Sequence, residues 1–176
     1  MANPGEALPL SGLKALDCTQ WNSGPMAMRI CGDLGADVIK IESIQHPDPL
    51  RMSGVVTGEA RASAPPQFYE QSGEWNYVNR NKRGLTLNLT TEAGADIFKR
   101  LVKGTDILAE NLRPGVWEGF GLGYDILKAI NPRLIFVQMP GYGTTGPWRD
   151  HPYWALAGDQ MSGFSSYTGY PGGTPL

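Results

Sequence analysis

LTLNLTTEAGADIFKRLVKGTDILAEN, residues 85–111, contains the pattern that decides the fold. Its first five residues alternate apolar and polar side chains, as a strand with one buried face does. Residues 91–103 follow with a helical pattern, and DILAEN (106–111) is typical of a second strand. A strand, a helix and a strand joined by short links predict a unit whose two strands run parallel.

The helix predicted over 91–103 has clear signals at both ends. Glu92 lies in its first turn, Lys103 in its last, and Gly104 follows as a stop. The side chains predicted to face the core are Ala93, Ile97, Leu101 and Val102. In the preceding strand, the residues predicted to share one face are Leu85, Leu87 and Leu89.

The same alternation extends along the rest of the chain. Further strands are predicted over 13–18, 37–42 and 133–139, and further helices over 24–35, 114–120, 124–130 and 154–163. The alternation predicts an α/β fold, with a parallel sheet covered by helices on both faces. The unbroken apolar run in RLIFVQM predicts that the last strand is buried on both faces. Residues 43–75 have no regular pattern and are expected to form a long irregular loop.

Composition limits the classes of protein to consider. With 176 residues the chain can form one domain or most of one, and 41% hydrophobic residues are usual for a soluble protein. A net charge of −2, from 15 basic and 17 acidic residues, argues against a nucleic-acid binder. No apolar run is as long as a membrane span, and residues 1–12 lack the features of a signal peptide. A cytoplasmic location with no membrane attachment is expected.

The chain has only two cysteines and two histidines, the usual zinc ligands. Cys18 and Cys31 lie in apolar segments and are expected to be buried free thiols in a reducing cytoplasm, with a disulfide or a metal pair as less favoured alternatives. His46 and His151 are the only histidines, and no cluster has the ligand spacing of zinc. We therefore predict no metal.

The loops that follow the strands are expected to form the ligand site. In an open parallel sheet, ligands bind beyond the carboxyl ends of the strands. The loops after Cys18, Glu42, Asn111 and Met139 should therefore open at one edge of the sheet. The functional residues of the protein are therefore expected at this edge.

A cluster of cations directly precedes one strand. The stretch NRNKRGLTLNL contains Arg80, Lys82 and Arg83. Two interpretations fit this cluster: a solvated strand entrance, or a site for phosphate oxygens, which arginine and lysine bind through charge-assisted hydrogen bonds. The stretch ENLRPG adds Arg113 just before a predicted helix start, a position that favours anions.

One glycine-rich loop resembles a dinucleotide-binding fingerprint. GYGTTG (141–146) matches G-x-G-x-x-G and follows a predicted strand. The fingerprint also requires the loop to open a helix directly, but Pro147, Trp148 and Pro152 interrupt it. We therefore expect a glycine-rich turn that passes close to a ligand or to another part of the backbone.

Five segments together carry a resemblance to one family. They are PLSGLKALDCTQWNSGP (9–25), GDLGADVIKIES (32–43), NRNKRGLTLNL (79–89), AENLRPGVWEGFGLGYDILKAINPRLIFVQMPGYGTTGP (109–147) and MSGFSSYTGY (161–170). In order and spacing they resemble the class III coenzyme A transferases, the CaiB/BaiF family. The resemblance implies a Rossmann-like domain that binds coenzyme A. Residues 1–176 would form its N-terminal part, without the family's second domain and C-terminal return segment.

The resemblance also implies roles for individual residues. Gln20 matches a family glutamine beside the reacting thioester, which implies a catalytic role. The residues implied in cofactor binding are Arg80, Lys82 and Arg83, near the nucleotide and phosphates, and Asn111, Leu112 and Arg113, in the loop around the cofactor. Ser43 and Gly119 stand where some members have cations, so the nucleotide contacts are expected to differ in detail.

The implied reaction is transfer of coenzyme A between an acyl-CoA thioester and a carboxylic acid. In the family an aspartate attacks the acyl-CoA, forming a mixed anhydride and then an enzyme-bound CoA thioester. That aspartate would lie beyond Leu176, so this chain alone is expected to be incomplete and inactive. Family members form interlocked dimers, which implies a homodimer or an oligomer with a related chain.

Two other functions stay open. One is a non-catalytic CoA-binding subunit that needs a partner chain for its chemistry. The other is an acyl-CoA racemase or isomerase. Racemases of the family carry a histidine before the MSG motif, where this chain has Trp154 and Ala155, so this function is less favoured.

Overall fold

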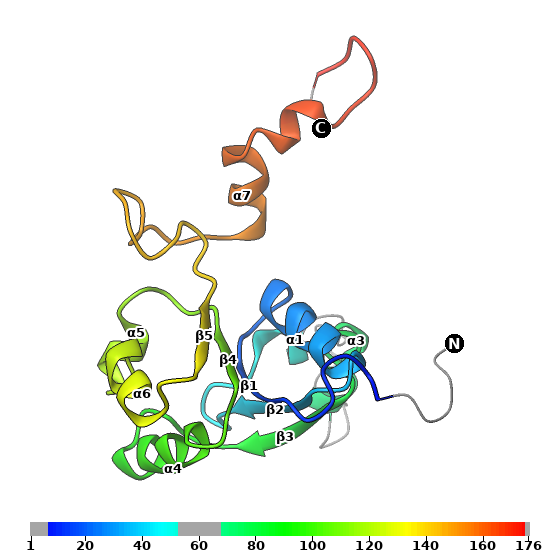
Figure 1. Ribbon diagram of the computed structural model, residues 1–176. Coiled ribbons are helices and arrows are strands. Elements are labelled where there is room, and N and C mark those ends of the chain that lie inside the picture. The colour runs from blue at the N-terminus through cyan, green and yellow to red at the C-terminus, as the bar shows by residue number, and fades with distance from the viewer. Residues whose placement is uncertain (1–6, 53–67, 175–176) are drawn as a thin grey trace.

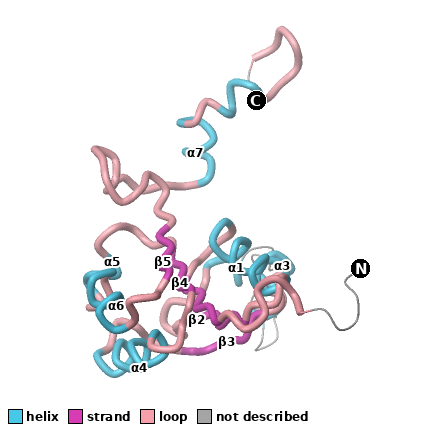
Figure 2. Tube along the Cα trace, in the orientation of Figure 1, coloured by secondary structure: helices cyan, strands magenta, loops and turns pink. Residues whose placement is uncertain are grey.

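A five-stranded parallel sheet forms the centre of the protein (Figures 1 and 2). The computed structural model describes residues 7–52 and 68–174. The strands have the order β3-β2-β1-β4-β5, and every neighbouring pair is parallel. Their bounds are β1 (Lys14–Cys18), β2 (Asp37–Glu42), β3 (Lys82–Thr86), β4 (Ile107–Glu110) and β5 (Ile135–Gln138). The predicted α/β class with a parallel sheet is confirmed.

Helices cover both faces of this sheet. Successive side chains of a strand point to opposite faces, and both faces carry apolar side chains that must be buried. Figure 1 shows α1 and α3 on one side and α4, α5 and α6 on the other. The helix bounds are α1 (Ser23–Asp33), α3 (Gly73–Asn79), α4 (Glu92–Val102), α5 (Val116–Gly119), α6 (Tyr124–Ile130) and α7 (Ala155–Met161). The described residues also form the short 3-10 helices η1 (Pro49–Met52), η2 (Phe68–Glu70) and η3 (Phe164–Tyr167).

The hydrophobic core has two parts, one on each face of the sheet. In β1, Ala15 belongs to the cluster that includes Met28 of α1, whereas Leu16 and Cys18 belong to the cluster that includes Phe98 of α4. This alternation follows from the two-residue period of a strand. It fixes which strand side chains approach α1 and which approach α4.

The predicted face of α4 is partly wrong. Val102 is buried and Leu101 half-buried, as expected, but Ala93 and Ile97 are exposed. Phe98 is instead completely buried, and its ring lies 5.5 Å from that of Trp117, between centroids. The helix is rotated by about one residue relative to the prediction, because an aromatic side chain fills the space between the sheet and α5.

The segment predicted to be irregular contains regular structure. Residues 43–75 include η1 and the start of α3, while residues 53–67 lie outside the described part of the chain. Ser72 caps α3: its Oγ accepts a hydrogen bond from the Trp75 N–H at 3.2 Å. Such a cap compensates for the weak helix propensity of a seven-residue segment that contains one glycine, two aromatic residues and two asparagines.

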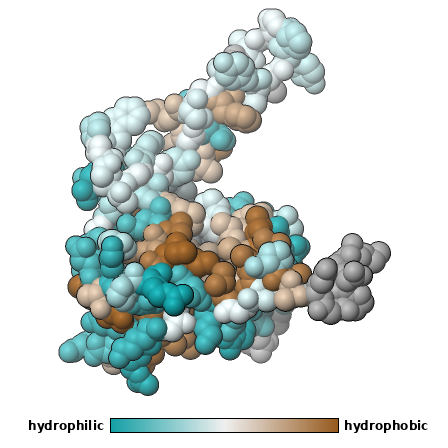
Figure 3. Space-filling view, in the orientation of Figure 1, coloured by the Kyte–Doolittle hydropathy of each residue, from teal (hydrophilic) through white to brown (hydrophobic). Residues whose placement is uncertain are grey.

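The prediction that β5 is buried on both faces is wrong. Ile135 and Val137 are 58% and 36% exposed. β5 is the edge strand of the sheet that the described residues form, and its Phe136 packs against Trp117 of α5 and Tyr124 of α6. The hydrophobic surface in Figure 3 includes the region of this strand.

After β5 the chain leads away from the sheet. This C-terminal segment, residues 140–174, contains α7 and η3 and extends beyond the carboxyl edge in Figure 1. Its large exposed apolar side chains are Trp148, Tyr153, Trp154, Leu156, Met161, Phe164, Tyr167 and Tyr170. Across residues 7–52 and 68–174, no helix has the length and apolar character needed to cross a membrane.

Candidate functional site

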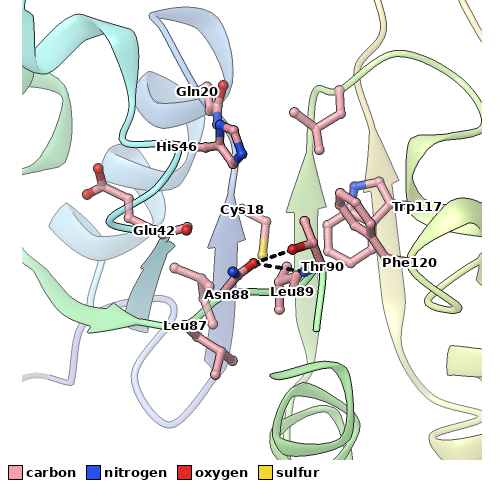
Figure 4. A pocket seen from close by; sticks show the side chains of 13 residues that line it. Cys18, Gln20, Glu42, His46, Leu87, Asn88, Leu89, Thr90, Trp117 and Phe120 are labelled. Carbon is pink, nitrogen blue, oxygen red and sulfur yellow. Dashed lines mark hydrogen bonds between the residues drawn. The ribbon is translucent and has the colours of Figure 1, made fainter. Parts of the chain in front are cut away.

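A pocket lies at the carboxyl edge of the sheet, and three of the four loops predicted there line it, whereas the loop after Met139 does not. Its volume is about 220 Å³. The loops after β1, β2, β3 and β4 all contribute to it, together with α5. Its lining residues are Cys18, Gln20, Ile41, Glu42, Ser43, His46, Leu87, Asn88, Leu89, Thr90, Leu112, Trp117 and Phe120. In Figure 4, Trp117 and Phe120 lie on one side of the pocket and Gln20 and His46 on the opposite side.

The pocket wall near β1 is apolar, and its one thiol is unreactive. Cys18 is 8% exposed, and burial, followed by the nearby Asp17 carboxylate, raises the pKa of its thiol well above the ordinary value. A thiol with a raised pKa stays protonated at neutral pH and is a poor nucleophile. Cys18 therefore serves as part of the apolar wall.

Gln20 and Asn111 are brought together by the pairing of β1 with β4. The Gln20 N–H donates to Asn111 Oδ1 at 2.7 Å, and Asn111 Nδ2 donates to the Gln20 carbonyl at 2.7 Å. The Asn111 side chain thus binds the backbone of Gln20 on both sides of the residue. This arrangement leaves the Gln20 side chain to line the pocket.

The three clustered cations have separate environments. Lys82 is buried: its side chain is 1% exposed, and its Nζ lies 2.7 Å from Asp17 Oδ2. Nζ also donates to Asn79 Oδ1 and to the Pro25 carbonyl, each at 2.8 Å. Burial lowers the pKa of Lys82, while the Asp17 carboxylate opposes that shift. Three acceptors within the protein therefore occupy this ammonium group.

Arg80 and Arg83 lie toward the amino end of β3, away from the pocket. Arg83 Nη2 pairs with Asp37 Oδ2 at 2.6 Å, at the start of β2. Arg80 Nη2 pairs with Asp33 Oδ2 at 2.7 Å, and this hydrogen bond lowers the pKa of Asp33. The structure thus brings Gln20 and the loop after β4 together, but it does not bring Arg80 and Arg83 to the same pocket.

The conformation of Asn81 determines that Lys82 and Arg83 point in opposite directions. Its backbone has φ 59°, in the left-handed region, and its Nδ2 donates to Asp33 Oδ1 at 2.6 Å. Asparagine adopts this conformation more readily than most residues. β3 begins at the next residue, with Lys82 turned inward and Arg83 outward.

The loop after β4 places two more predicted residues at the carboxyl edge. Leu112 lines the pocket, and its N–H donates to the buried Glu110 carboxylate at 2.6 Å. Burial raises the pKa of Glu110. Arg113 is exposed, and its Nη2 donates to the Asp150 carbonyl of the C-terminal segment at 3.4 Å. The helix expected just after Arg113 begins only at Val116 and has four residues.

Sequence reasoning missed a buried ion pair next to the loop that carries Gln20. Lys40 Nζ lies 3.2 Å from Asp48 Oδ2, with side chains 3% and 0% exposed. A charged residue between apolar neighbours in DVIKIE was the available signal for Lys40. Next to this pair, burial acts to raise the pKa of Glu42, but hydrogen bonds from Arg51, at 2.8 Å to each carboxylate oxygen, hold it below its ordinary value.

The glycine-rich loop 141–146 forms turns and opens no helix, as its prolines indicate. Gly143 and Gly146 have φ 82° and 93°, which favour glycine. A Cβ on Gly141 would lie 1.9 Å from Cγ of Tyr153. The glycines therefore permit tight turns and a close approach to a ring, without the geometry of a dinucleotide site.

One wall of the pocket depends on a close backbone approach, which leads to a prediction. A Cβ on Gly94 would lie 1.8 Å from the carbonyl oxygen of Asn88, a lining residue. We expect Gly94→Ala to lower the free energy of unfolding by about 1–3 kcal/mol, because the backbone must shift. Chemical denaturation measures the change. Gly73→Ala, where a Cβ meets nothing within 4 Å, is the control; an equal effect of both changes would contradict the explanation.

Comparison with known proteins identifies relatives along almost the whole chain. The model of CoA-transferase family III matches residues 10–176. The chain is 40% identical over 169 residues to the succinyl-CoA–L-malate CoA-transferase beta subunit of Chloroflexus aurantiacus, covering 96% of this chain and 39% of the relative. It is 40% identical over 167 residues to the acetyl-CoA:oxalate CoA-transferase of Acetobacter aceti, covering 95% and 40%.

The solved structures give the same result for the fold. A crystal structure of a CaiB/BaiF family protein from Brucella suis superposes with a TM-score of 0.81 at 34% identity, covering 97% of this chain and 43% of that one. The chain thus spans about two fifths of the length of the proteins that it matches.

Proposed function

Because the chain belongs to CoA-transferase family III, we propose that its carboxyl-edge pocket binds coenzyme A and that the protein transfers coenzyme A from an acyl-CoA thioester to a carboxylic acid. The observation that carries the proposal is the position of Gln20, which lines an apolar pocket between the ends of β1 and β4. The strand order reverses there, and open α/β sheets bind ligands at such a reversal.

The chemistry of the pocket fits a thioester better than a free acid. Its wall of Cys18, Trp117 and Phe120 offers apolar contacts for the uncharged part of an acyl-CoA. Gln20 supplies a neutral amide, which can donate a hydrogen bond to a thioester carbonyl without adding charge. Leu112 and Arg113 extend the site outward, and the Arg113 guanidinium suits phosphate oxygens.

The three clustered cations have different roles in this proposal. Lys82 would act by holding Asp17 and the strand ends beneath the site, since its three donors already have acceptors. Arg80 and Arg83 would contact the nucleotide only if it reached the amino end of β3. Arg113 is therefore the preferred candidate for the phosphate contact.

The proposed mechanism proceeds through covalent enzyme intermediates. A carboxylate, in the family an aspartate, attacks the thioester carbonyl carbon, and the carbon–sulfur bond breaks to release the CoA thiolate and leave a mixed anhydride. The thiolate then attacks the anhydride to give an enzyme-bound thioester and the first free acid. We propose no residue of this chain as that nucleophile. Trapping of an acyl-enzyme with hydroxylamine or borohydride in the intact protein tests this step.

The acceptor is proposed to be a small dicarboxylic acid, because the two relatives described above act, by name, on L-malate and on oxalate. The assay offers succinyl-CoA or acetyl-CoA to the intact protein together with each acid and detects the new thioester by chromatography. Transfer to either acid supports the proposal. Loss of the donor only by hydrolysis, with no new thioester for any acid, would reject it.

A second chain is also proposed as a partner, because relatives of this chain carry the names of alpha and beta subunits. The partner could be a second copy or a related chain. Native mass measurement of the intact protein, alone and co-expressed with any related neighbouring gene product, distinguishes the two. A monomer under both conditions would contradict the proposal.

The phosphate contact gives a prediction on binding. Arg113→Ala should weaken CoA binding by about 10-fold or more, since a hydrogen bond to a charged group contributes roughly 1.5–3 kcal/mol. Isothermal calorimetry of the intact protein measures the affinity. Arg133→Ala is the matched control, because Arg133 is an exposed arginine at the amino edge, just before β5. Unchanged affinity in Arg113→Ala would remove this residue from the site.

A further inference from the structure

The loop that carries Gln20 is held in place by side chains from several segments. The bonds reach three consecutive residues, Thr19, Gln20 and Trp21. They are Thr19 N–H to Asp17 Oδ1 (3.0 Å), Lys40 Nζ to the Thr19 carbonyl, Gln20 N–H to Asn111 Oδ1 (2.7 Å), Asn111 Nδ2 to the Gln20 carbonyl (2.7 Å) and Trp21 N–H to Asp48 Oδ1 (3.0 Å). The backbone of a catalytic candidate is thus fixed by groups remote in sequence.

The loop needs such bonds because its conformation is unfavourable by itself. Trp21 has φ 63°, in the left-handed region that a bulky residue rarely adopts. Strained backbone of this kind persists only where surrounding groups determine it. Close packing adds to the restraint: a Cβ on Gly24 would lie 2.4 Å from Cβ of Thr19.

The ion pair of Lys40 and Asp48 contacts the loop on both sides of Gln20. Lys40 donates to the carbonyl of Thr19, the residue before it. Asp48 accepts from the N–H of Trp21, the residue after it, and from the N–H of Leu50 at 3.0 Å. Neither member of the pair lines the pocket. Asp48 also donates its backbone N–H to Glu42, which lines the pocket, at 3.1 Å. The side-chain bonds of the pair, however, lead directly to the backbone on both sides of Gln20.

We propose that Lys40 and Asp48 are positioning residues, whose buried ion pair holds the Gln20 loop in the conformation that directs Gln20 into the pocket. This inference rests on the proposed function for the role of Gln20, but not for the restraint on the loop. Packing alone does not require the charges, since well-packed apolar residues often replace a buried ion pair without loss of stability. The charges instead provide directed bonds to two backbone atoms.

The test replaces both charges together, in the intact protein. Lys40→Met with Asp48→Leu removes the directed bonds and leaves no unpaired buried charge. Hydrogen–deuterium exchange should become at least about 10-fold faster in the peptide that covers residues 19–22, while exchange in α4 stays unchanged. The control, Asp96→Asn with Lys99→Met, removes a surface pair of α4 and should leave the loop unchanged.

Kinetics provide the second readout. Misplacing a reacting group by about 1 Å can reduce the rate about 100-fold, so the variant should lose 10- to 100-fold in kcat while the KM for acyl-CoA changes less than about threefold. Unchanged loop exchange, or faster exchange with wild-type kcat, would overturn the inference. If the variant does not fold, Lys40→Met with Asp48→Val, which also removes the side-chain bonds to both loop residues, is measured against the same criteria.

The two readouts separate this inference from the proposed function. A wild-type protein that neither binds coenzyme A nor transfers it would reject the function. Hydrogen exchange would still decide whether the ion pair restrains the loop, because that measurement needs no substrate. Faster exchange then supports the restraint, and unchanged exchange rejects it.

Discussion

Replacing Lys82 with methionine should lower the free energy of unfolding by about 3–5 kcal/mol, because it leaves the Asp17 carboxylate buried without its partner. Asp17 is 0% exposed, and its other carboxylate oxygen is already committed to Thr19. The loss should appear in urea unfolding of the intact protein as a lower midpoint with an unchanged slope.

The adjacent residue supplies the control. Arg83 also forms an ion pair, but its side chain is 66% exposed, so Arg83→Met should change stability by less than about 1 kcal/mol. Combining Lys82→Met with Asp17→Asn should recover part of the lost stability, since no buried charge then remains. If Lys82→Met and Arg83→Met lowered the free energy of unfolding equally, burial of the Lys82–Asp17 pair would not be the cause of the loss.

Phe98→Ala is expected to have a similarly large effect, about 3–5 kcal/mol, because it empties a space in the middle of the core. Phe98 is 0% exposed and packs against Trp117, which lines the pocket. The pocket wall should therefore loosen as well, and the fluorescence of the protein should shift toward that of solvated tryptophan.

Ile97→Ala tests the orientation of α4. Ile97 is 42% exposed, so truncating it should change stability by less than about 1 kcal/mol. The sequence pattern places Ile97 in the core, and the structure places Phe98 there. If the isoleucine variant lost more stability than the phenylalanine variant, the rotation of the helix would be wrong.

The fold could be predicted from the sequence because its decisive signals are local. The two-residue period of strands and the stop at Gly104 depend only on neighbouring residues. The faces of α4 and β5 were harder, because burial depends on what packs against each element. Helix α3 was missed, since its stability comes from the Ser72 cap and from packing on α1 more than from propensity.

The candidate site could be predicted only in outline. The rule on strand ends placed Gln20 and Asn111 at the same edge, and the structure joins them by two hydrogen bonds. The partner of Lys82 could not be read from the sequence, because Asp17 lies 65 residues earlier. Their contact depends on the order of the strands and on the face that each side chain takes.

The residue before β3, Asn81, has a left-handed backbone conformation, and its position determines which side chains of the strand point inward and which point outward. Asn81 ends the turn one residue before β3, and side chains alternate along the strand from that point. An insertion or deletion of a single residue next to Asn81 would exchange the inward and outward positions of the two following cations. Arginine would then have to fit a space shaped for an ammonium group, while lysine faced solvent. Tolerance to length changes at this turn should therefore be far lower than its exposed position suggests.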